Sequence, residues 1–178
     1  MKAVFLDRDG VINADRDDYV KNTRELVIYP FAPAAIRALN EAGWPVFVIS
    51  NQQGVAKGII RDEDLLAIQS EITRQVRDGG GTISAFYYCK HLATDNCDCR
   101  KPRAGLLLQA AEEHHIDLES SVMVGDTDRD IAAGKAAGCR TILVLTGKLR
   151  REDAAHFNSR PDMIAQDLAE AAELIRRF

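Results

Sequence analysis

Short runs of consecutive apolar residues recur along the chain, and polar or acidic residues end each of them. Continuous apolar runs of this kind are typical of strands that are buried on both faces of a parallel sheet. The clearest examples are residues 4–6 and residues 46–49. The pattern predicts about five parallel strands, near residues 4–7, 45–50, 83–88, 121–126 and 140–145.

Between these strands the apolar residues recur every three to four positions, which is the period of an amphipathic helix. The longest such segment, residues 62–77, has an expected inward face made of Leu65, Leu66, Ile68, Ile72 and Val76. The same pattern predicts helices near residues 30–42, 103–115, 128–137 and 166–176. Strands that alternate with helices predict a doubly wound α/β fold, in which a parallel sheet carries helices on both faces.

The length and composition fit a single domain that spans residues 1–178. The chain is 46% hydrophobic and 28% charged, which is ordinary for a globular protein with a substantial core. No insertion between the predicted elements is long enough to form a separate cap domain over a site. Residues 146–162 are mostly polar, so we expect an irregular segment there and assign it no chemistry.

The net charge of -4 argues against nucleic acid as a partner, because binding to DNA or RNA depends on a basic face. The chain has no apolar stretch of transmembrane length, and its first residues lack the apolar core of a signal peptide. We therefore expect a cytoplasmic protein with no membrane contact, and we expect it to be monomeric.

Two carboxylates separated by one residue, Asp7 and Asp9, follow the first predicted strand. The carboxyl ends of parallel strands form the edge at which open α/β sheets bind ligands. There, an ionised carboxylate can attack an electrophile while a protonated neighbour donates a proton to the leaving group. Followed by Gly10, the same pair also suits a turn of solvated acids, so the pair alone leaves both interpretations open.

Other polar residues follow the remaining strands and would meet Asp7 and Asp9 at the same edge. They are Ser50, Asn51, Arg100, Lys101, Asp126 and Asp130. Carboxylates from two strands suit Mg²⁺, which prefers oxygen ligands, whereas a hydroxyl, an amide and a lysine suit phosphate oxygens. Each residue alone also suits a helix cap or a solvated position. Together they predict a site for phosphoryl transfer.

Three cysteines and a histidine lie within residues 89–99, a segment with neither a helical nor a strand period. The candidate ligands are Cys89, His91, Cys97 and Cys99. Three thiolates and one imidazole complete a closed tetrahedral zinc site, and closed sites are structural. We expect Zn²⁺ to order this loop. Disulfide bonds are the alternative, but a Cys-x-Cys pair is poorly placed to bridge to itself.

Four segments resemble, in order, the motifs of phosphatases of the haloacid dehalogenase (HAD) superfamily. They are Asp7-Arg8-Asp9-Gly10, Ser50-Asn51-Gln52-Gln53-Gly54, Lys101-Pro102 and Gly125-Asp126-Thr127-Asp128-Arg129-Asp130. The segment from Cys89 to Pro102 is similar to the zinc-bearing branch of this superfamily, which includes heptose-bisphosphate and histidinol-phosphate phosphatases. The resemblance implies a Rossmann-like HAD fold without a separate cap domain and the activity of a phosphoric monoester hydrolase.

The resemblance also implies roles for the candidate residues. Asp7 would attack phosphorus to form an aspartyl-phosphate, and Asp9 would protonate the leaving alkoxide and then activate water. Mg²⁺ would be held by Asp7, the main-chain carbonyl of Asp9 and Asp126. Ser50 and Lys101 would bind the transferred phosphoryl group.

The substrate would be a small phosphorylated sugar, and Arg100 would reach its second phosphate or the sugar itself. The residues that would line the substrate pocket are Asp15, Arg16, Asp17, Asp18, Asn51, Gln52 and Gln53. The combination of Ser-Asn-Gln with Cys-Asp-Cys-Arg-Lys-Pro favours the 7-phosphate of D-glycero-D-manno-heptose 1,7-bisphosphate, in the synthesis of nucleotide-heptose precursors of surface polysaccharide. Histidinol phosphate or a broader range of sugar phosphates is the alternative. A zinc-stapled binding module without turnover is an alternative of another class, because a fold does not guarantee chemistry.

Overall fold

The first strand of the chain, β1 (Val4–Leu6), lies in the middle of a six-stranded parallel sheet. The computed structural model describes residues 1–178, and the strand order is β3-β2-β1-β4-β5-β6. The other strands are β2 (Val46–Asn51), β3 (Ala85–Cys89), β4 (Val122–Gly125), β5 (Arg140–Val144) and β6 (Met163–Ala165). The predicted doubly wound α/β fold is confirmed.

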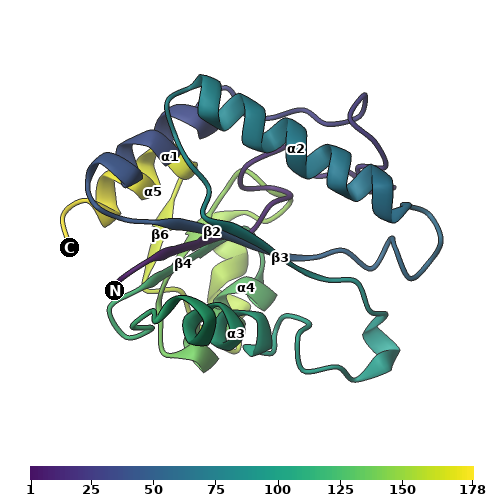
Figure 1. Ribbon diagram of the computed structural model, residues 1–178. Helices are drawn as coiled ribbons and strands as arrows, with labels where there is room; N and C mark the ends of the chain where they lie inside the picture. Colours follow the sequence, from purple (N-terminus) through teal and green to yellow (C-terminus); the bar gives the residue numbers. More distant parts are fainter.

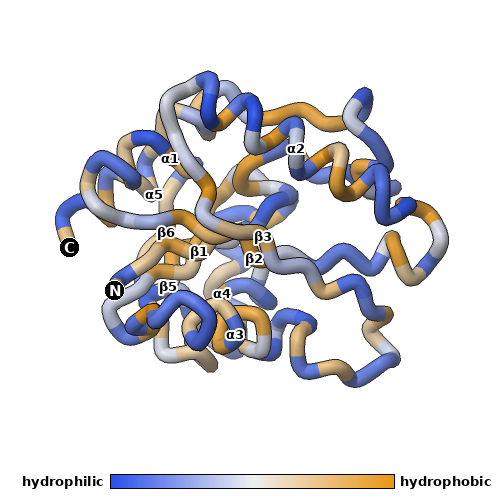
Figure 2. Tube along the Cα trace, in the orientation of Figure 1, coloured by the Kyte–Doolittle hydropathy of each residue, from blue (hydrophilic) through white to orange (hydrophobic).

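Helices cover both faces of the sheet (Figure 1). On one face lie α1 (Ala32–Glu41), α2 (Asp62–Asp78) and α5 (Leu168–Ile175). On the other face lie α3 (Gly105–His114) and α4 (Asp128–Ala137). Figure 2 shows that hydrophobic residues are concentrated in the strands between these two layers, as a sheet buried on both faces requires.

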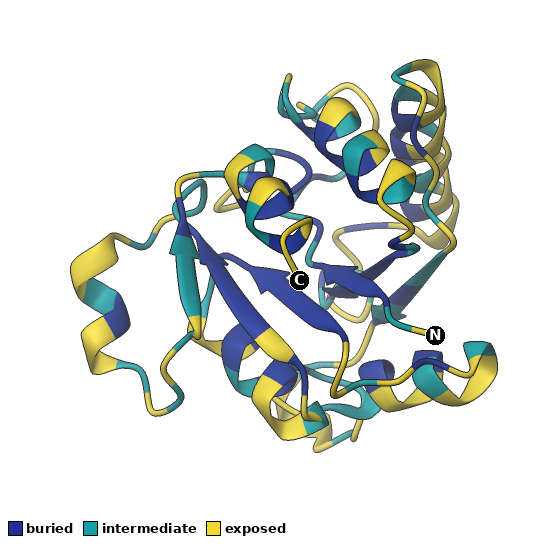
Figure 3. Ribbon diagram, turned by 90° about the vertical axis from the view of Figure 1, so that its left-hand side faces the viewer, coloured by how far each residue is buried: buried dark blue, intermediate teal, exposed yellow.

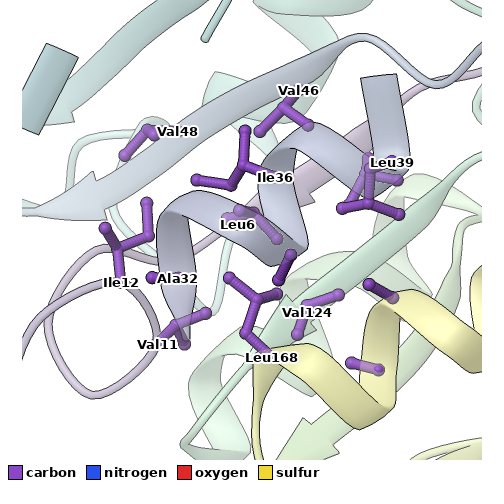
Figure 4. Close-up of a cluster of buried hydrophobic side chains, with 14 of the residues drawn as sticks. Leu6, Val11, Ile12, Ala32, Ile36, Leu39, Val46, Val48, Val124 and Leu168 are labelled. Atoms are coloured by element: carbon purple, nitrogen blue, oxygen red, sulfur yellow. The ribbon is translucent and has the colours of Figure 1, made fainter. Parts of the chain in front are cut away.

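Alternate residues of β1 point to opposite faces of the sheet and enter two separate core clusters. Leu6 belongs to the larger cluster and Phe5 to the smaller one. Figure 4 shows Leu6 packed near Ile36 of α1 and Leu168 of α5, and all three side chains are fully buried. Burial of such a side chain contributes about 1.5–3 kcal/mol. This packing on both sides fixes the strand that delivers Asp7.

The structure contains elements that the hydrophobic pattern does not predict. The sixth strand, β6, is three residues long and pairs with β5 at the edge of the sheet. The segment that we expected to be irregular contains the 3₁₀ helix η2 (Arg151–His156), and the cysteine-rich segment contains η1 (Ala93–Asp95). Leu66, predicted to face inward, is 59% exposed because it lies one residue off the row that the inward side chains of α2 follow.

Burial follows the layers: in Figure 3 the central strands are mostly dark blue, the edge strands β3 and β6 are partly teal, and most exposed residues lie on the outer helix surfaces and in the loops. None of the helices is both long enough and apolar enough to cross a membrane. The carboxyl ends of β1, β2 and β4 lie next to one another in the sheet. Residues that follow these three strands are therefore brought to one edge.

Candidate active site

Three carboxylates meet beyond the ends of β1 and β4. Asp7 follows β1, Asp126 follows β4, and Asp130 lies in the first turn of α4. Their carboxylate oxygens lie within 4.8 Å of one another. Burial, together with repulsion between these carboxylates, raises the pKa of Asp126 to about 9 and the pKa of Asp7 to about 6. This cluster of oxygen ligands suits Mg²⁺, whose charge offsets the repulsion.

Two glycines leave the space that the Asp126 carboxyl group occupies. A Cβ atom at Gly10 would lie 2.2 Å from Asp126 Oδ2, and a Cβ atom at Gly147 would lie 2.0 Å from the same oxygen. Gly10 also has a φ angle of +81°, which L side chains rarely adopt. The glycine that follows Asp9 in the sequence is therefore required both by backbone conformation and by the position of Asp126.

Lys101 is almost completely buried next to these carboxylates. Its Nζ lies 3.0 Å from Asp7 Oδ1 and 2.5 Å from Asp130 Oδ1, and it donates a hydrogen bond to the carbonyl of Ile49 at 2.8 Å. Burial lowers the pKa of the Lys101 ammonium, but the two carboxylates outweigh it and hold the pKa above its ordinary value. The Asn51 side chain exchanges two hydrogen bonds with the main chain of Lys101, at 3.0 and 3.1 Å. This pair fixes the lysine to the end of β2.

Asp9 is held by three side chains. Arg8 Nη2 donates to both of its oxygens at 2.7 and 2.8 Å, Asn13 Nδ2 donates to Oδ1 at 2.9 Å, and Gln52 Nε2 donates to Oδ2 at 2.8 Å. Burial raises the pKa of Asp9, but Arg8 and these hydrogen bonds outweigh burial, so the pKa lies below its usual value. Gln52 also donates to the buried hydroxyl of Ser50 at 3.0 Å, which links Ser50 to Asp9.

These residues line a polar cavity of about 220 Å³. The sequence-predicted residues among its lining are Asp7, Asp9, Asp15, Arg16, Asp17, Ser50, Asn51, Gln52, Gln53, Arg100, Lys101 and Asp126. Asp18, which we predicted to line the substrate pocket, does not belong to the lining. Its side chain is 61% exposed and pairs with Arg16 at 3.0 Å and with Lys21 at 2.6 Å. The ion pairs turn this carboxylate away from the cavity.

The cavity is also lined by residues to which sequence reasoning gave no role. They are Arg8, Tyr19, Val20, Thr127, Arg129 and Lys148, and the lining also includes Asp130, which we expected at this edge of the sheet. Thr127 and Arg129 lie within the fourth motif, so their position in this motif could have identified them as residues of the site. Lys148 comes from the segment to which we assigned no chemistry, and its Nζ lies 2.5 Å from Asp17 Oδ1 and 3.2 Å from Asp15 Oδ2. No local pattern points to this contact.

The four candidate zinc ligands converge at the loop after β3. Their donor atoms, on Cys89, His91, Cys97 and Cys99, lie within 4.8 Å of one another. The distance between sulfur atoms is 3.6 Å from Cys89 to Cys97 and 3.4 Å from Cys97 to Cys99, and His91 Nδ1 lies 3.2 Å from Cys99 Sγ. A tetrahedral site with Zn–S bonds of about 2.3 Å has edges of about 3.8 Å, so these side chains fit zinc. All cysteines of the chain are free thiols.

Comparison with known proteins places this site in a family. Residues 98–171 match the HAD-hydrolase-like family. The D-glycero-β-D-manno-heptose-1,7-bisphosphate 7-phosphatase of Pseudomonas aeruginosa is 42% identical over 145 residues, which cover 82% of this chain and 82% of that enzyme. The enzyme of the same name from Bordetella bronchiseptica is 38% identical over 173 residues, which cover 97% of each chain. The chain belongs to the heptose-bisphosphate phosphatase family.

Solved structures of this heptose-bisphosphate phosphatase family have the same fold. The crystal structure of D,D-heptose 1,7-bisphosphate phosphatase from B. bronchiseptica, complexed with magnesium and phosphate, has a TM-score of 0.93 at 37% identity and covers 99% of each chain. The enzyme from Burkholderia thailandensis has a TM-score of 0.72 at 34% identity and covers 97% of each chain. The predicted HAD fold and enzyme class are confirmed: the chain is a phosphoric monoester hydrolase of the HAD type.

Proposed function

We propose that this chain removes the 7-phosphate of D-glycero-D-manno-heptose 1,7-bisphosphate in a Mg²⁺-dependent reaction. One observation carries the proposal. Asp7, Lys101 and Asp126 line one cavity in a chain that aligns over 97% of its length with an enzyme of that name. The polar lining of this cavity suits a phosphorylated sugar, because hydroxyl and phosphate groups need hydrogen-bonding partners when they leave water.

The reaction begins when the carboxylate of Asp7 attacks phosphorus and the bond between phosphorus and the sugar oxygen breaks, which leaves an aspartyl-phosphate. Lys101 and the Ser50 hydroxyl stabilise the charge on the phosphoryl oxygens. Asp9 donates its proton to the departing oxygen, and the negative charge of the incoming phosphate favours this protonated form against the opposing effect of Arg8. The Asp9 carboxylate then takes a proton from the water that attacks phosphorus and releases Asp7.

Mg²⁺ fits the carboxylate cluster described above. Asp7, the main-chain carbonyl of Asp9 and Asp126 would hold it, beside the carboxylate of Asp130. When bound, Mg²⁺ supplies positive charge next to the phosphoryl oxygens, which is the main electrostatic need of phosphoryl transfer. The raised pKa of Asp126 supports this role. Without a cation the ionised form of this buried carboxyl group is unfavourable, and a bound cation would stabilise it.

Zinc has a structural role in this proposal. The three thiolates and the imidazole fill all four positions of a tetrahedron, which leaves no open position for a substrate. The last ligand, Cys99, is followed directly by Arg100 and Lys101. Zinc binding would therefore order the segment that delivers both cations to the cavity.

Steady-state kinetics with heptose 1,7-bisphosphate, histidinol phosphate and fructose 1,6-bisphosphate tests the substrate. We expect kcat/KM for the heptose bisphosphate to exceed the other two values by about 100-fold or more, because a site built for polar contacts discriminates strongly against ligands that leave them unpaired. A preference for histidinol phosphate would overturn the assignment, and equal values for all three would identify a phosphatase of broad range.

The variant Asp7→Asn tests the nucleophile. It removes the attacking oxygen charge, so we expect a fall in kcat of about 10⁴-fold or more, with inorganic phosphate still bound as a competitive ligand. Turnover at the rate of the unaltered enzyme would refute the role of Asp7. If the unaltered chain binds phosphate but hydrolyses none of the three esters, the binding-module alternative is correct.

A further inference from the structure

The segment that follows β5 contacts several parts of the active site in succession. Thr146 Oγ1 donates a hydrogen bond to the carbonyl of Gly10 at 2.5 Å. Gly147 lies against the carboxyl group of Asp126, where no Cβ atom would fit. These contacts fix the backbone of the segment beside the site, and the next residue, Lys148, lines the polar cavity.

Lys148 joins this segment to the acidic loop (residues 15–18) by two ion pairs. Its Nζ lies 2.5 Å from Asp17 Oδ1 and 3.2 Å from Asp15 Oδ2, and both aspartates line the cavity. No other cation forms an ion pair with either carboxylate, whereas Asp18 of the same loop pairs with two neighbouring cations. Lys148 is therefore the one cation that compensates the cavity side of this loop.

We propose that Lys148 is a positioning residue for the sugar part of the substrate. It holds and neutralises Asp15 and Asp17, so that these carboxylates can accept hydrogen bonds from sugar hydroxyl groups without repelling the phosphate groups. This inference rests on the proposed function, because it requires a substrate that carries hydroxyl groups as well as phosphate. Lys148 acts through the two carboxylates and not through the phosphate that is transferred.

The charge of the cavity explains why the acidic loop needs a cation. Six carboxylates line a cavity that must admit a phosphate ester, and they are Asp7, Asp9, Asp15, Asp17, Asp126 and Asp130. Those of the catalytic centre are compensated by Arg8, by Lys101 and by the Mg²⁺ of the proposed function. Without Lys148, the acidic loop would add two uncompensated negative charges and oppose the approach of an anion.

The contacts of Asp15 also leave it free to bind hydroxyl groups. Its Oδ1 accepts a hydrogen bond from the main-chain nitrogen of Arg16 at 2.8 Å, and its Oδ2 faces Lys148. A contact at each oxygen fixes the plane of the carboxylate, and about two of its four lone-pair sites remain open. The Lys148 side chain is 58% exposed, and ion pairs at exposed positions add little to global stability, so the variants proposed below should fold.

The first test compares a sugar phosphate with an ester that has no sugar hydroxyl groups. For Lys148→Gln we expect KM for heptose 1,7-bisphosphate to rise by about 5- to 20-fold, with kcat changed by less than about 2-fold. KM for p-nitrophenyl phosphate should rise by less than about 3-fold. Lys135→Gln, which removes a lysine paired with Asp162 outside the cavity lining, is the matched control and should change none of these values. Equal rises in KM for both esters would overturn the inference.

A double-mutant cycle tests whether Lys148 acts through the two carboxylates. In the background of Asp15→Asn with Asp17→Asn, the further change Lys148→Gln should alter KM by less than about 2-fold, because no charge remains for the lysine to compensate. If Lys148→Gln raises KM by the same factor in both backgrounds, the lysine acts by its own contact with the substrate, and the inference is overturned.

Hydrogen exchange of the free protein tests the same contact without a substrate. Lys148→Gln should speed exchange by about 3-fold or more in a peptide that spans residues 14–21 and leave α3 unchanged, because only the acidic loop loses its connection. Unchanged exchange in residues 14–21 would overturn the inference for any substrate. If the unaltered enzyme prefers histidinol phosphate, the proposed function fails, while the exchange measurement still decides the role of Lys148.

Discussion

Replacement of Asp126 by asparagine should stabilise the metal-free protein while it abolishes the response to Mg²⁺. The Asp126 side chain is almost completely buried beside Asp7 and Asp130, and burial with this repulsion raises its pKa from 3.8 to about 9. At pH 7 the unfolded chain carries this carboxyl group ionised, whereas the folded chain must bind a proton to keep it neutral. An asparagine of nearly the same shape avoids that requirement.

The magnitude follows from the distance between the ordinary pKa and the working pH. The ordinary pKa of 3.8 lies about 3 units below pH 7, and each unit corresponds to about 1.4 kcal/mol. The buried carboxyl group of Asp126 therefore lowers the free energy of unfolding at pH 7 by at most about 4 kcal/mol. For a carboxyl group with a raised pKa the penalty is absent below the ordinary pKa and grows with pH up to the folded value. We therefore expect Asp126→Asn to gain about 2–4 kcal/mol at pH 7 and about 1.5 kcal/mol or less at pH 5.

Urea unfolding in the presence of EDTA at both pH values measures this difference. Added Mg²⁺ should raise the unfolding midpoint of the unaltered protein and leave that of Asp126→Asn unchanged. Asp128→Asn, an exposed carboxylate two residues away, is the matched control and should shift the stability by less than about 0.5 kcal/mol. The reasoning is refuted if metal-free Asp126→Asn is less stable than the unaltered protein at pH 7, or if its gain is the same at pH 5.

Two further substitutions test the zinc loop and the glycine beside the site. Cys97→Ser should abolish stoichiometric zinc binding and lower the melting temperature, because three ligands cannot complete the closed site; unchanged zinc content by mass spectrometry would contradict the structural role. Gly10→Ala places a Cβ atom 2.2 Å from Asp126 Oδ2 at a φ of +81°, so we expect a loss of about 2 kcal/mol or more and a higher Mg²⁺ requirement. Gly58→Ala shares the positive φ (+68°) but meets nothing within 4 Å, so it should cost only about 1 kcal/mol of backbone strain. Equal losses in the two alanine variants would show that the contact with Asp126 is unimportant.

The parts of the fold that were predictable are those with a strong local pattern. A strand buried on both faces must be apolar throughout, which makes β1 and β2 visible in the sequence and places Asp7 and Ser50 at their ends. By contrast, β6 is only three residues long, and its extended form depends on pairing with β5. No periodicity can be read from three residues, so this strand could not be predicted.

The candidate site shows the same division. Residues within the motifs, such as Asp9 and Lys101, were placed correctly at the cavity. Lys148 was missed because its contact with Asp17 joins residues 131 positions apart and depends on how two loops meet. Asp18 was misplaced because the acidic loop has no period, and only the ion pairs with Arg16 and Lys21 decide which carboxylate turns outward.

The central position of β1 has a consequence for the nascent protein on the ribosome. β1 emerges first, but Val4 pairs with Val46 about 40 residues later and with Val122 about 120 residues later. Until the second of these partners has left the exit tunnel, the opening strand has an unprotected edge, and Asp7 has no Asp126 opposite it. A translation product that stops before β4 therefore lacks two of the three clustered carboxylates, Asp126 and Asp130, so competence for hydrolysis arises only during the last third of synthesis.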